Sequence, residues 1–229
     1  MALAFFDLDR TLLSVNSATL WVRREVALGF VRKRDAFRAA LWLARYQLGF
    51  VNAEGLVEEA VAQLAGTRVA DLKARTRRFY EAEVKPTYRP GGLEALAWHR
   101  GRGDRPILLT SSSLYLSELV AADLGIEEIL CTRFEADAEG FHTGRVVGRA
   151  CFGAGKLAYA QASAARHGVA LEDCTFYTDS FSDLPVLERV GRPVAVNPDP
   201  RLRRLATKRG WPVTDWGTPE GDVRRGEVA

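Results

Sequence analysis

The stretch that decides the fold lies near the amino terminus, where residues 2–11 read ALAFFDLDRT. Its first five residues form a short apolar run, which is typical of a strand buried in a parallel sheet. Asp7 and Asp9 follow at once, so this strand delivers two carboxylates at its carboxyl end. Because residues two apart share a face in an extended chain, both side chains can serve one site.

Three further apolar runs end in polar residues in the same way, at residues 106–110 (PILLT), 174–179 (CTFYTD) and 193–197 (PVAVN). Helical patterns lie beside them, at residues 114–124, 156–167 and 183–190. Short apolar strands that alternate with helices predict an α/β fold with an open, mostly parallel, Rossmann-like sheet. Ligands bind such sheets beyond the carboxyl ends of the strands, where all four polar endings fall.

Residues 17–84 follow a different pattern, because their apolar residues keep helical spacing and no run resembles a strand. The marked faces are Phe37, Leu41, Ala44 and Leu48; Val57, Ala60, Val61 and Leu64; and Leu72, Thr76, Phe79 and Tyr80. We expect about four helices that form a helical-bundle cap inserted into the core. The core then consists of residues 1–16 and 85–216.

Two other segments have readable patterns. Residues 132–147, with Glu139 and Gly140 at their middle, predict a β-hairpin on the core. Residues 217–229 are dominated by Gly, Pro and charged residues, which predicts a disordered tail.

Composition bounds the kind of protein and its partners. The chain has 229 residues, 47% hydrophobic and 27% charged, as globular proteins do. A formal net charge of +3 is too small to indicate a nucleic-acid partner. No apolar run approaches the roughly 18 residues that span a bilayer, and the amino-terminal run lacks a basic lead. Three cysteines without CxxC spacing indicate neither a disulfide framework nor a zinc site. We expect a cytoplasmic protein without membrane or nucleic-acid partners, and its oligomeric state stays open.

The two carboxylates after the first strand suit phosphoryl transfer. An ionised Asp7 can attack phosphorus and form an acyl-phosphate. A protonated Asp9 can donate to the departing oxygen and then deprotonate the hydrolytic water. A surface turn or a simple metal site would explain the same two residues. The other polar residues predicted to lie beside them therefore decide between these interpretations.

The accompanying polar residues come from three other places in the chain. Thr110 ends the second strand, and Ser111 and Ser112 lead from it toward a helix, where a hydroxyl and free amides can bind an anion. An ordinary helix cap explains these residues equally well. Lys156 follows Gly153-Ala154-Gly155 and can pair with the nucleophile and with a phosphate oxygen.

The third apolar run ends in two more carboxylates. Asp179 and Asp183 lie four residues apart, and with Asp7 they form a corner suited to a hard cation such as Mg²⁺. Mg²⁺ there would offset the repulsion between carboxylates and an anionic phosphate. An aspartate cap on the next helix is the alternative interpretation.

The order of these motifs resembles the haloacid dehalogenase superfamily of phosphatases. Its four signatures are matched by residues 7–11, Thr110, Lys156 and residues 179–183, and the cap position is similar to the phosphoserine-phosphatase-like branch, subfamily IB. The resemblance implies Asp7 as nucleophile and magnesium ligand. It implies Asp9 as general acid and base that also gives the metal its backbone carbonyl. Asp179 would ligate magnesium, and Asp183 would support it directly or through water.

The resemblance also implies the substrate class and exposes departures from the family pattern. Dehalogenases lack the second aspartate, so Asp9 favours a small phosphorylated substrate. Phosphoserine phosphatases carry a glutamate nine residues after the nucleophile, where this chain has Asn16, and two glycines where it has Ser111 and Ser112. An amide cannot attract the substrate ammonium as a carboxylate does, so we predict poor hydrolysis of phosphoserine. Arg10 and Asn16 are further candidate substrate contacts.

Two alternatives to hydrolysis stay open at this point, and a third is discounted. A phosphotransferase would pass the phosphoryl group to an acceptor other than water. A binding module on the same fold would hold a phosphorylated ligand without turnover. A response-regulator receiver also uses an aspartate, a threonine and a lysine, but receivers are about half this size and have no cap.

Overall fold

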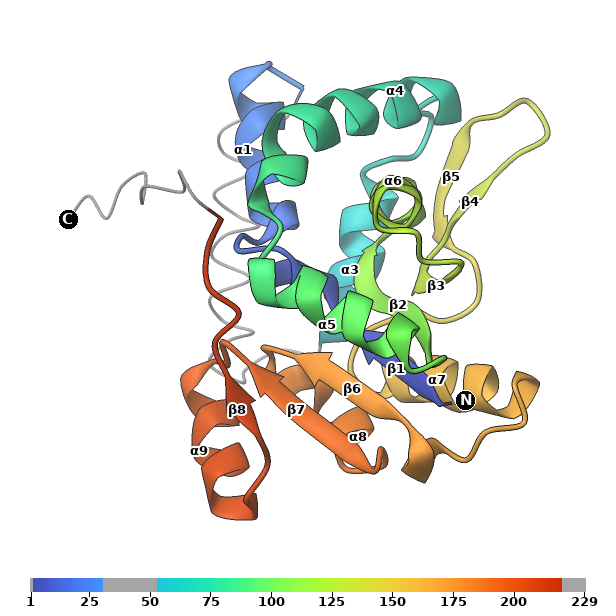
Figure 1. Ribbon diagram of the computed structural model, residues 1–229. Coiled ribbons are helices and arrows are strands. Elements are labelled where there is room, and N and C mark those ends of the chain that lie inside the picture. The colour runs from blue at the N-terminus through green and yellow to red at the C-terminus, as the bar shows by residue number, and fades with distance from the viewer. Residues whose placement is uncertain (1, 31–52, 220–229) are drawn as a thin grey trace.

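The computed structural model describes residues 2–30 and 53–219, and a parallel six-stranded sheet forms its centre (Figure 1). The strand order is β3-β2-β1-β6-β7-β8. In that order the strands span Glu128–Thr132, Arg105–Ser113, Leu3–Phe6, Thr175–Thr178, Arg192–Val196 and Val213–Thr214. The four strands that the apolar runs predict are present, and the α/β fold is confirmed.

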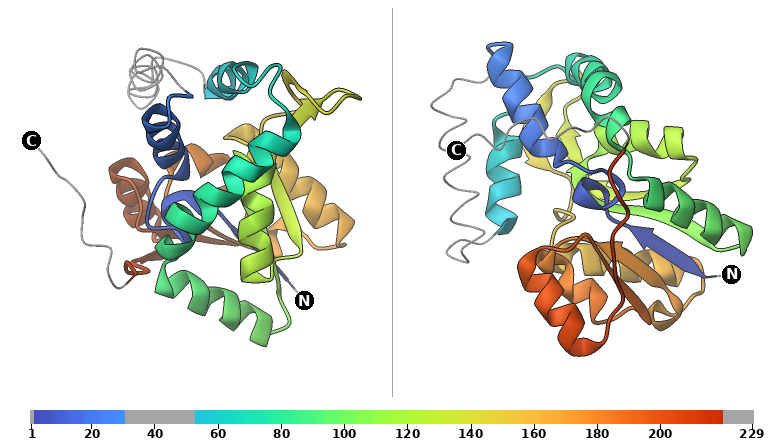
Figure 2. Two further views of the ribbon diagram at one scale, coloured as in Figure 1. Left: turned by 90° about the horizontal axis from the view of Figure 1, so that it is seen from above. Right: turned by 60° about the vertical axis from the view of Figure 1, so that its left-hand side comes forward.

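Helices cover both faces of this sheet (Figures 1 and 2). One face packs on α5 (Pro90–Gly101) and α6 (Leu114–Leu124), and the other on α7 (Ala154–Arg166), α8 (Leu184–Leu187) and α9 (Pro200–Arg209). Strand β1 shows the reason, because Leu3 and Phe5 join one core while Ala4 and Phe6 join the other. Since both faces are buried, the strand reads as a continuous apolar run.

The helical cap follows β1 in the chain and lies beyond the end of that strand (Figures 1 and 2). Its described helices are α1 (Ser17–Ala27), α3 (Ala53–Ala62) and α4 (Val69–Phe79). A π-type turn, Tyr80–Val84, and a 3-10 turn, Lys85–Thr87, return the chain to the core. The face predicted on α4 is buried at Leu72, Thr76, Phe79 and Tyr80.

Two predictions about the cap are not decided by the structure. The helix marked by Phe37, Leu41, Ala44 and Leu48 lies outside the described residues. The division between core residues 1–16 and 85–216 and cap residues 17–84 stays a prediction. Within the described part of the chain, no helix has both the length and the apolar character to cross a membrane.

The predicted hairpin is present and reaches the cap. Its strands are β4 (Phe134–Ala136) and β5 (His142–Val146), within the expected residues 132–147. Backbone hydrogen bonds of 2.9 Å join it to the loop between α3 and α4, from Gly66 N to His142 O and from His142 N to Thr67 O. A third, also of 2.9 Å, runs from Val69 N to Gly140 O. The hairpin therefore links cap and core.

The structure corrects several boundaries. Strand β2 does not end at Thr110 but continues to Ser113, and its register with β3 shifts between Leu109 and Ser113. Strands β3 and β8 carry no prediction, because β3 begins with a glutamate that follows another, Glu127, and β8 has only two residues. Helix α7 begins at Ala154, two residues before Lys156, and α8 is shorter than residues 183–190.

Gly217, predicted to begin a disordered tail, is held in place. Its N–H donates to Asp215 Oδ1 at 2.8 Å, and its carbonyl accepts a bond from Arg89. The remaining part of that predicted tail, residues 220–229, lies outside the described residues.

Candidate active site

The predicted nucleophile lies at the carboxyl end of β1, in a tight loop. Asp7 extends the sheet by one step, because its N–H donates to Tyr177 O at 2.9 Å. The chain then turns through Leu8–Leu12, and Arg10 adopts a left-handed conformation with φ of 57°. Arg89, which is buried, donates from its Nε to the Arg10 carbonyl at 3.2 Å. This bond holds the strained turn that follows the nucleophile.

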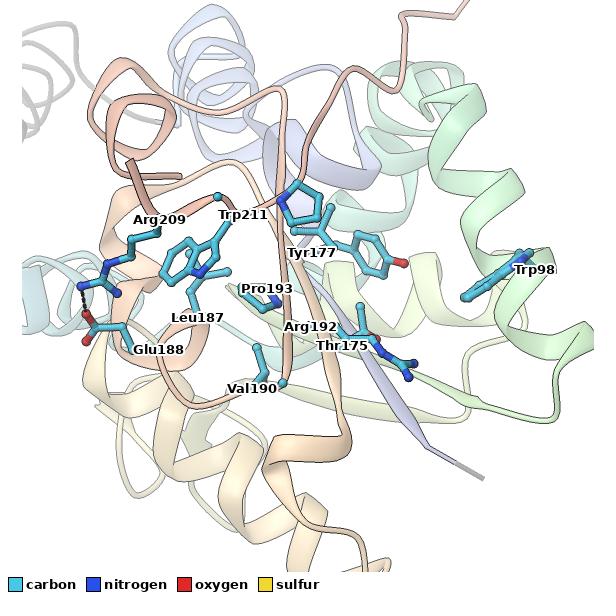
Figure 3. A pocket seen from close by; sticks show the side chains of 14 residues that line it. Trp98, Thr175, Tyr177, Leu187, Glu188, Val190, Arg192, Pro193, Arg209 and Trp211 are labelled. Carbon is cyan, nitrogen blue, oxygen red and sulfur yellow. Dashed lines mark ion pairs between the residues drawn. The ribbon is translucent and has the colours of Figure 1, made fainter. Parts of the chain in front are cut away.

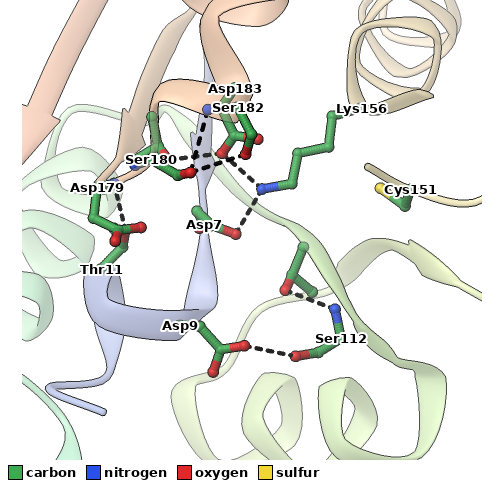
Figure 4. Close-up of polar contacts among 12 residues, drawn as sticks. Asp7, Asp9, Thr11, Ser112, Cys151, Lys156, Asp179, Ser180, Ser182 and Asp183 are labelled. Atoms are coloured by element: carbon green, nitrogen blue, oxygen red, sulfur yellow. Dashed lines mark hydrogen bonds and ion pairs between the residues drawn. The ribbon is translucent and has the colours of Figure 1, made fainter. Parts of the chain in front are cut away.

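Lys156 joins two of the predicted carboxylates (Figure 4). Its ammonium lies 2.8 Å from Asp7 Oδ1 and 2.8 Å from Asp183 Oδ2, and its side chain is 3% exposed. The preceding Gly155 allows this approach, since a Cβ there would lie 2.1 Å from the Ala150 carbonyl oxygen. The Gly-Lys pair is therefore a steric requirement of the first turn of α7.

Asp179 and Asp183 follow β6 and are held by threonines. Asp179 N donates to Thr11 Oγ1 at 3.0 Å, which ties the first motif to the last across 168 residues. Asp183 Oδ2 accepts from Thr178 Oγ1 at 2.7 Å as well as from Lys156. Asp183 Oδ2 is therefore shared by two donors, and the role of Asp183 in supporting a metal, directly or through water, stays a prediction.

Asp9 and the residues after β2 form the other side of the site. Asp9 Oδ1 accepts from the Ser17 N–H at 2.7 Å, and Asp9 Oδ2 accepts from Ser112 Oγ at 3.3 Å. Thr110 is fully buried, and its Oγ1 accepts from the Ser112 N–H at 3.1 Å. Ser111 is partly exposed between them. The sequence predicted phosphate contacts from both serines, yet the Ser112 hydroxyl is directed at Asp9.

The two further candidate substrate contacts, Asn16 and Arg10, have different surroundings. Asn16 caps α1, since its Oδ1 accepts from the N–H and the Oγ1 of Thr19, each at 2.9 Å. Its oxygen is therefore engaged within the chain, and its NH₂ group is the part left to meet a ligand. Arg10 is exposed at the loop surface.

The electrostatics of the cluster are dominated by burial. Burial raises the pKa of Asp7 to about 7, against the attraction of Lys156 and with the repulsion of Asp183. Burial and the repulsion of Asp7 and Asp183 raise the pKa of Asp179 to about 8. Burial alone would lower the pKa of Lys156, but Asp183 and Asp7 outweigh it and raise that pKa. Lysine therefore stays charged while carboxylates compete for protons.

The cluster offers oxygen donors to a metal ion. Within residues 2–30 and 53–219, no three Asp, Glu, His or Cys side chains are grouped as a ready-made ion site. Four carboxylates nevertheless lie close together, and only two cationic groups, Lys156 and Arg10, act on them. The formal charge of these six groups is −2. The carboxylates are those of Asp7, Asp9, Asp179 and Asp183. Oxygen donors with that excess charge fit a hard divalent cation.

Several residues that support the cluster were not singled out from the sequence. Arg89 and Thr178 lie outside the motifs, and Asp199 lies in the next loop. Asp199 Oδ2 accepts from Phe181 N at 2.7 Å, and Asp199 N donates to Asp179 O at 2.8 Å. The loop after β7 thus braces the loop after β6. The polar ending at residues 197–199 was the available signal for this contact.

A second cavity lies away from this cluster (Figure 3). It has a volume of about 720 Å³. Thr175 and Arg192, at the starts of β6 and β7, are among the residues that line it. Its one acidic residue, Glu188, pairs with Arg209 at 2.6 Å. The groups able to do chemistry are therefore gathered at the other ends of these strands.

A parallel sheet with a helical cap and an aspartate–lysine cluster at the strand ends defines a capped α/β enzyme. The chain belongs to the haloacid dehalogenase-like hydrolases, whose family model matches residues 4–188. The match includes every motif described above.

Individual relatives cover nearly the whole chain. Phosphoserine phosphatase SerB1 of Mycobacterium tuberculosis is 35% identical over 219 residues, which cover 94% of this chain and 71% of that protein. Histidinol-phosphatase of Neisseria meningitidis is 29% identical over 93% of this chain and 98% of its own length. A protein of unknown function from Bordetella pertussis has a crystal structure with a TM-score of 0.85 and 32% identity, covering 94% of this chain and 99% of its own.

Proposed function

We propose that the protein is a magnesium-dependent phosphomonoester hydrolase that acts on a small phosphorylated metabolite through a phospho-aspartate. The observation that carries the proposal is the buried Lys156 ammonium, 2.8 Å from Asp7 Oδ1, with Asp9 two residues further along the same loop. The family and the phosphatase names of two relatives support it.

Each residue has a role in the first half of the reaction. Asp7 attacks phosphorus, the bond from phosphorus to the leaving oxygen breaks, and Asp9 gives its proton to that oxygen. Thr110 and Lys156, with the amide at residue 111, hold the phosphoryl oxygens. Arg10 and Asn16 are candidate contacts to the rest of the substrate.

The second half returns the enzyme to its starting state. Water attacks the phospho-aspartate, Asp9 takes its proton, and the bond between the Asp7 oxygen and phosphorus breaks to release phosphate. Carboxylates of Asp7 and Asp179 and the backbone carbonyl of Asp9 would hold Mg²⁺, and Asp183 would support the ion directly or through water. The ion would neutralise charge on the phosphate and favour the ionised form of Asp7.

The compartment follows from the cysteines. Cys131, Cys151 and Cys174 are free and buried. Thiols kept unpaired are usual in a reducing compartment, which supports a cytoplasmic location.

Phosphate release across a panel of phosphomonoesters with Mg²⁺ tests the proposal. We expect wild type to release phosphate and Asp7→Asn to be slower by about 10⁴-fold or more, since nucleophile loss has costs of that order. Histidinol phosphate and phosphoserine belong in the panel, and the engaged Asn16 oxygen predicts poor turnover of phosphoserine.

Two outcomes would favour the alternatives. If wild type releases phosphate from no substrate of the panel, a binding module would be favoured. Release that depends on an added alcohol, with the phosphoryl group recovered on that alcohol, would favour a phosphotransferase.

A further inference from the structure

Both oxygens of the Asp9 carboxylate are held, and by different kinds of donor. Oδ1 accepts from a backbone amide, Ser17 N, at 2.7 Å. Oδ2 accepts from a hydroxyl, Ser112 Oγ, at 3.3 Å (Figure 4). The amide belongs to the first residue of the cap helix α1, and the hydroxyl to the end of core strand β2. Asp9 therefore lies between cap and core.

The backbone of Ser112 is anchored so that its hydroxyl reaches Asp9. Its N–H donates to Thr110 Oγ1 at 3.1 Å, within the stretch where β2 loses its regular register with β3. Its Oγ also lies 3.4 Å from Ser17 Oγ. A short chain of hydroxyls thus runs from Asp9 through Ser112 to Ser17.

A hydroxyl has a property here that an amide lacks. A hydroxyl can donate to an ionised carboxylate and accept from a protonated one, whereas an N–H can only donate. Asp9 must pass through both states when it gives a proton to the leaving oxygen and takes one from water. Ser112 can partner Oδ2 in both states, and the Ser17 hydroxyl lies beside both Ser112 and the Asp9 carboxyl.

We propose that Ser112 is a positioning residue that orients the Asp9 carboxyl for proton transfer, instead of a ligand of the phosphate. The inference rests on the proposed function. In the step concerned, the oxygen–phosphorus bond of the ester breaks, phosphorus bonds to Asp7, and the Asp9 proton passes to the leaving oxygen. Misorienting Asp9 slows this step most when the leaving oxygen is strongly basic.

Two substrates of similar size separate this role from phosphate binding. Benzyl phosphate releases a strongly basic alkoxide that needs a proton, and p-nitrophenyl phosphate releases a weakly basic phenolate that does not. For Ser112→Ala we expect kcat/KM, which reports the step that forms the phospho-aspartate, to fall about 10-fold on benzyl phosphate and by less than about 3-fold on p-nitrophenyl phosphate, since general acids contribute about 10²–10⁴-fold in full. The comparison uses kcat/KM because hydrolysis of the phospho-aspartate, in which Asp9 acts as the base, is common to both substrates and contributes to kcat.

Three matched variants complete the experiment. Asp9→Asn should show the same selective loss in larger measure. Ser111→Ala, which removes the neighbouring hydroxyl, should leave the ratio of the two kcat/KM values as in wild type, because a phosphate contact serves both substrates equally. Ser112→Thr, which restores a hydroxyl, should bring that ratio back toward the wild-type value.

The result that would overturn the role of Ser112 is an equal loss of kcat/KM on both substrates. That result would mark Ser112 as a phosphate contact. Wild type that hydrolyses neither substrate, nor any other of the panel, would defeat the proposed function itself. The two failures are therefore distinguishable, and thermal melting of each variant shows whether it is folded.

Discussion

At the scale of single residues, the site depends on one buried cation. Lys156 is the partner of two carboxylates, at 2.8 Å from each, and its neighbour Gly155 cannot be replaced without moving the helix. A buried charge is tolerated where opposite charges surround it. Here the carboxylates outnumber the cation, so the cluster is balanced only when protons or another cation contribute.

Lys156→Met should therefore be damaging in two ways. Removing one member of a buried ion pair costs about 3–5 kcal/mol, because the remaining charges lose their partner. We expect a loss of that order in the free energy of unfolding, measured by urea denaturation at pH 8, and at least about a 100-fold loss of kcat. Lys208→Met, at an exposed position, should change neither. Near-wild-type stability of Lys156→Met would contradict the buried pairing.

The site residues that could be predicted from the sequence are those that belong to an ordered series of recognisable motifs. Asp7 and Asp179 follow strand ends, Lys156 follows a glycine, and Thr110 ends the apolar run of β2 three residues before that strand ends. Parallel strands bring such residues to one edge of the sheet. The supporting contacts could not be predicted in this way. Arg89 reaches Arg10 across 79 residues, and nothing in a local pattern encodes which loop a buried arginine will hold.

At the scale of elements, the hairpin and the cap are coupled more closely than either pattern suggested. Three backbone hydrogen bonds join them, and Gly144 of β5 lies against the end of α3. A Cβ at Gly144 would lie 3.0 Å from Ala65 Cβ and 3.2 Å from Ala62 O. Close backbone packing, and not the turn alone, therefore requires glycine at this position.

Gly144→Ala and Gly140→Ala separate these two requirements. Both glycines have a positive φ, 80° and 82°, but a Cβ at Gly140 would meet nothing within 4 Å. We expect Gly140→Ala to cost about 1 kcal/mol from conformation alone, and Gly144→Ala about 1–2 kcal/mol more, from crowding against α3. Equal losses in urea denaturation would mean that the hairpin does not press on the cap.

The elements missed from the sequence share a physical cause. Strand β8 has two residues and pairs only with Ala195 and Val196, so no run marks it. Strand β3 begins with a glutamate, Glu128, whose carboxylate is paired with Arg166 and His167. Tertiary partners made both segments into strands, and such partners leave no trace in local periodicity.

At the scale of the whole molecule, stability depends on pH through a buried histidine. His99 bridges α5 to β6, with Nδ1 2.9 Å from Asp104 and Nε2 3.0 Å from the Tyr177 hydroxyl. Burial lowers its pKa, against the attraction of Asp104 and together with the repulsion of Arg102 and Arg192. The unfolded chain then takes up a proton before the folded one does, as pH falls below about 6.5.

The stability that neutral His99 contributes is therefore fully present above about pH 6.5 and is lost as pH falls toward the lowered pKa of the folded state. His99→Gln lacks this proton uptake. We expect the difference in free energy of unfolding between wild type and His99→Gln to shrink between pH 7 and pH 5, by at most about 1.4 kcal/mol per pH unit. A difference that grows as pH falls would mean that folding raises the pKa of His99 instead of lowering it.

The whole molecule should also respond to Mg²⁺ without any substrate. A ligand that binds only the folded state stabilises it, by about 1.4 kcal/mol at ten times its Kd. For a domain of this size that corresponds to a rise in Tm of about 3–6 °C. The excess charge of the cluster is the physical reason, because a divalent cation relieves the repulsion among Asp7, Asp179 and Asp183.

Differential scanning calorimetry with MgCl₂ or with EDTA measures this response. Asp179→Asn removes one expected ligand, so its Tm in EDTA should equal or exceed that of wild type, while its Mg²⁺-dependent rise should be largely lost. Asp173→Asn removes an exposed carboxylate elsewhere and should keep the full rise. An equal Mg²⁺ response in all three proteins would mean that the ion acts on the general surface, and the carboxylate cluster would then require another source of positive charge.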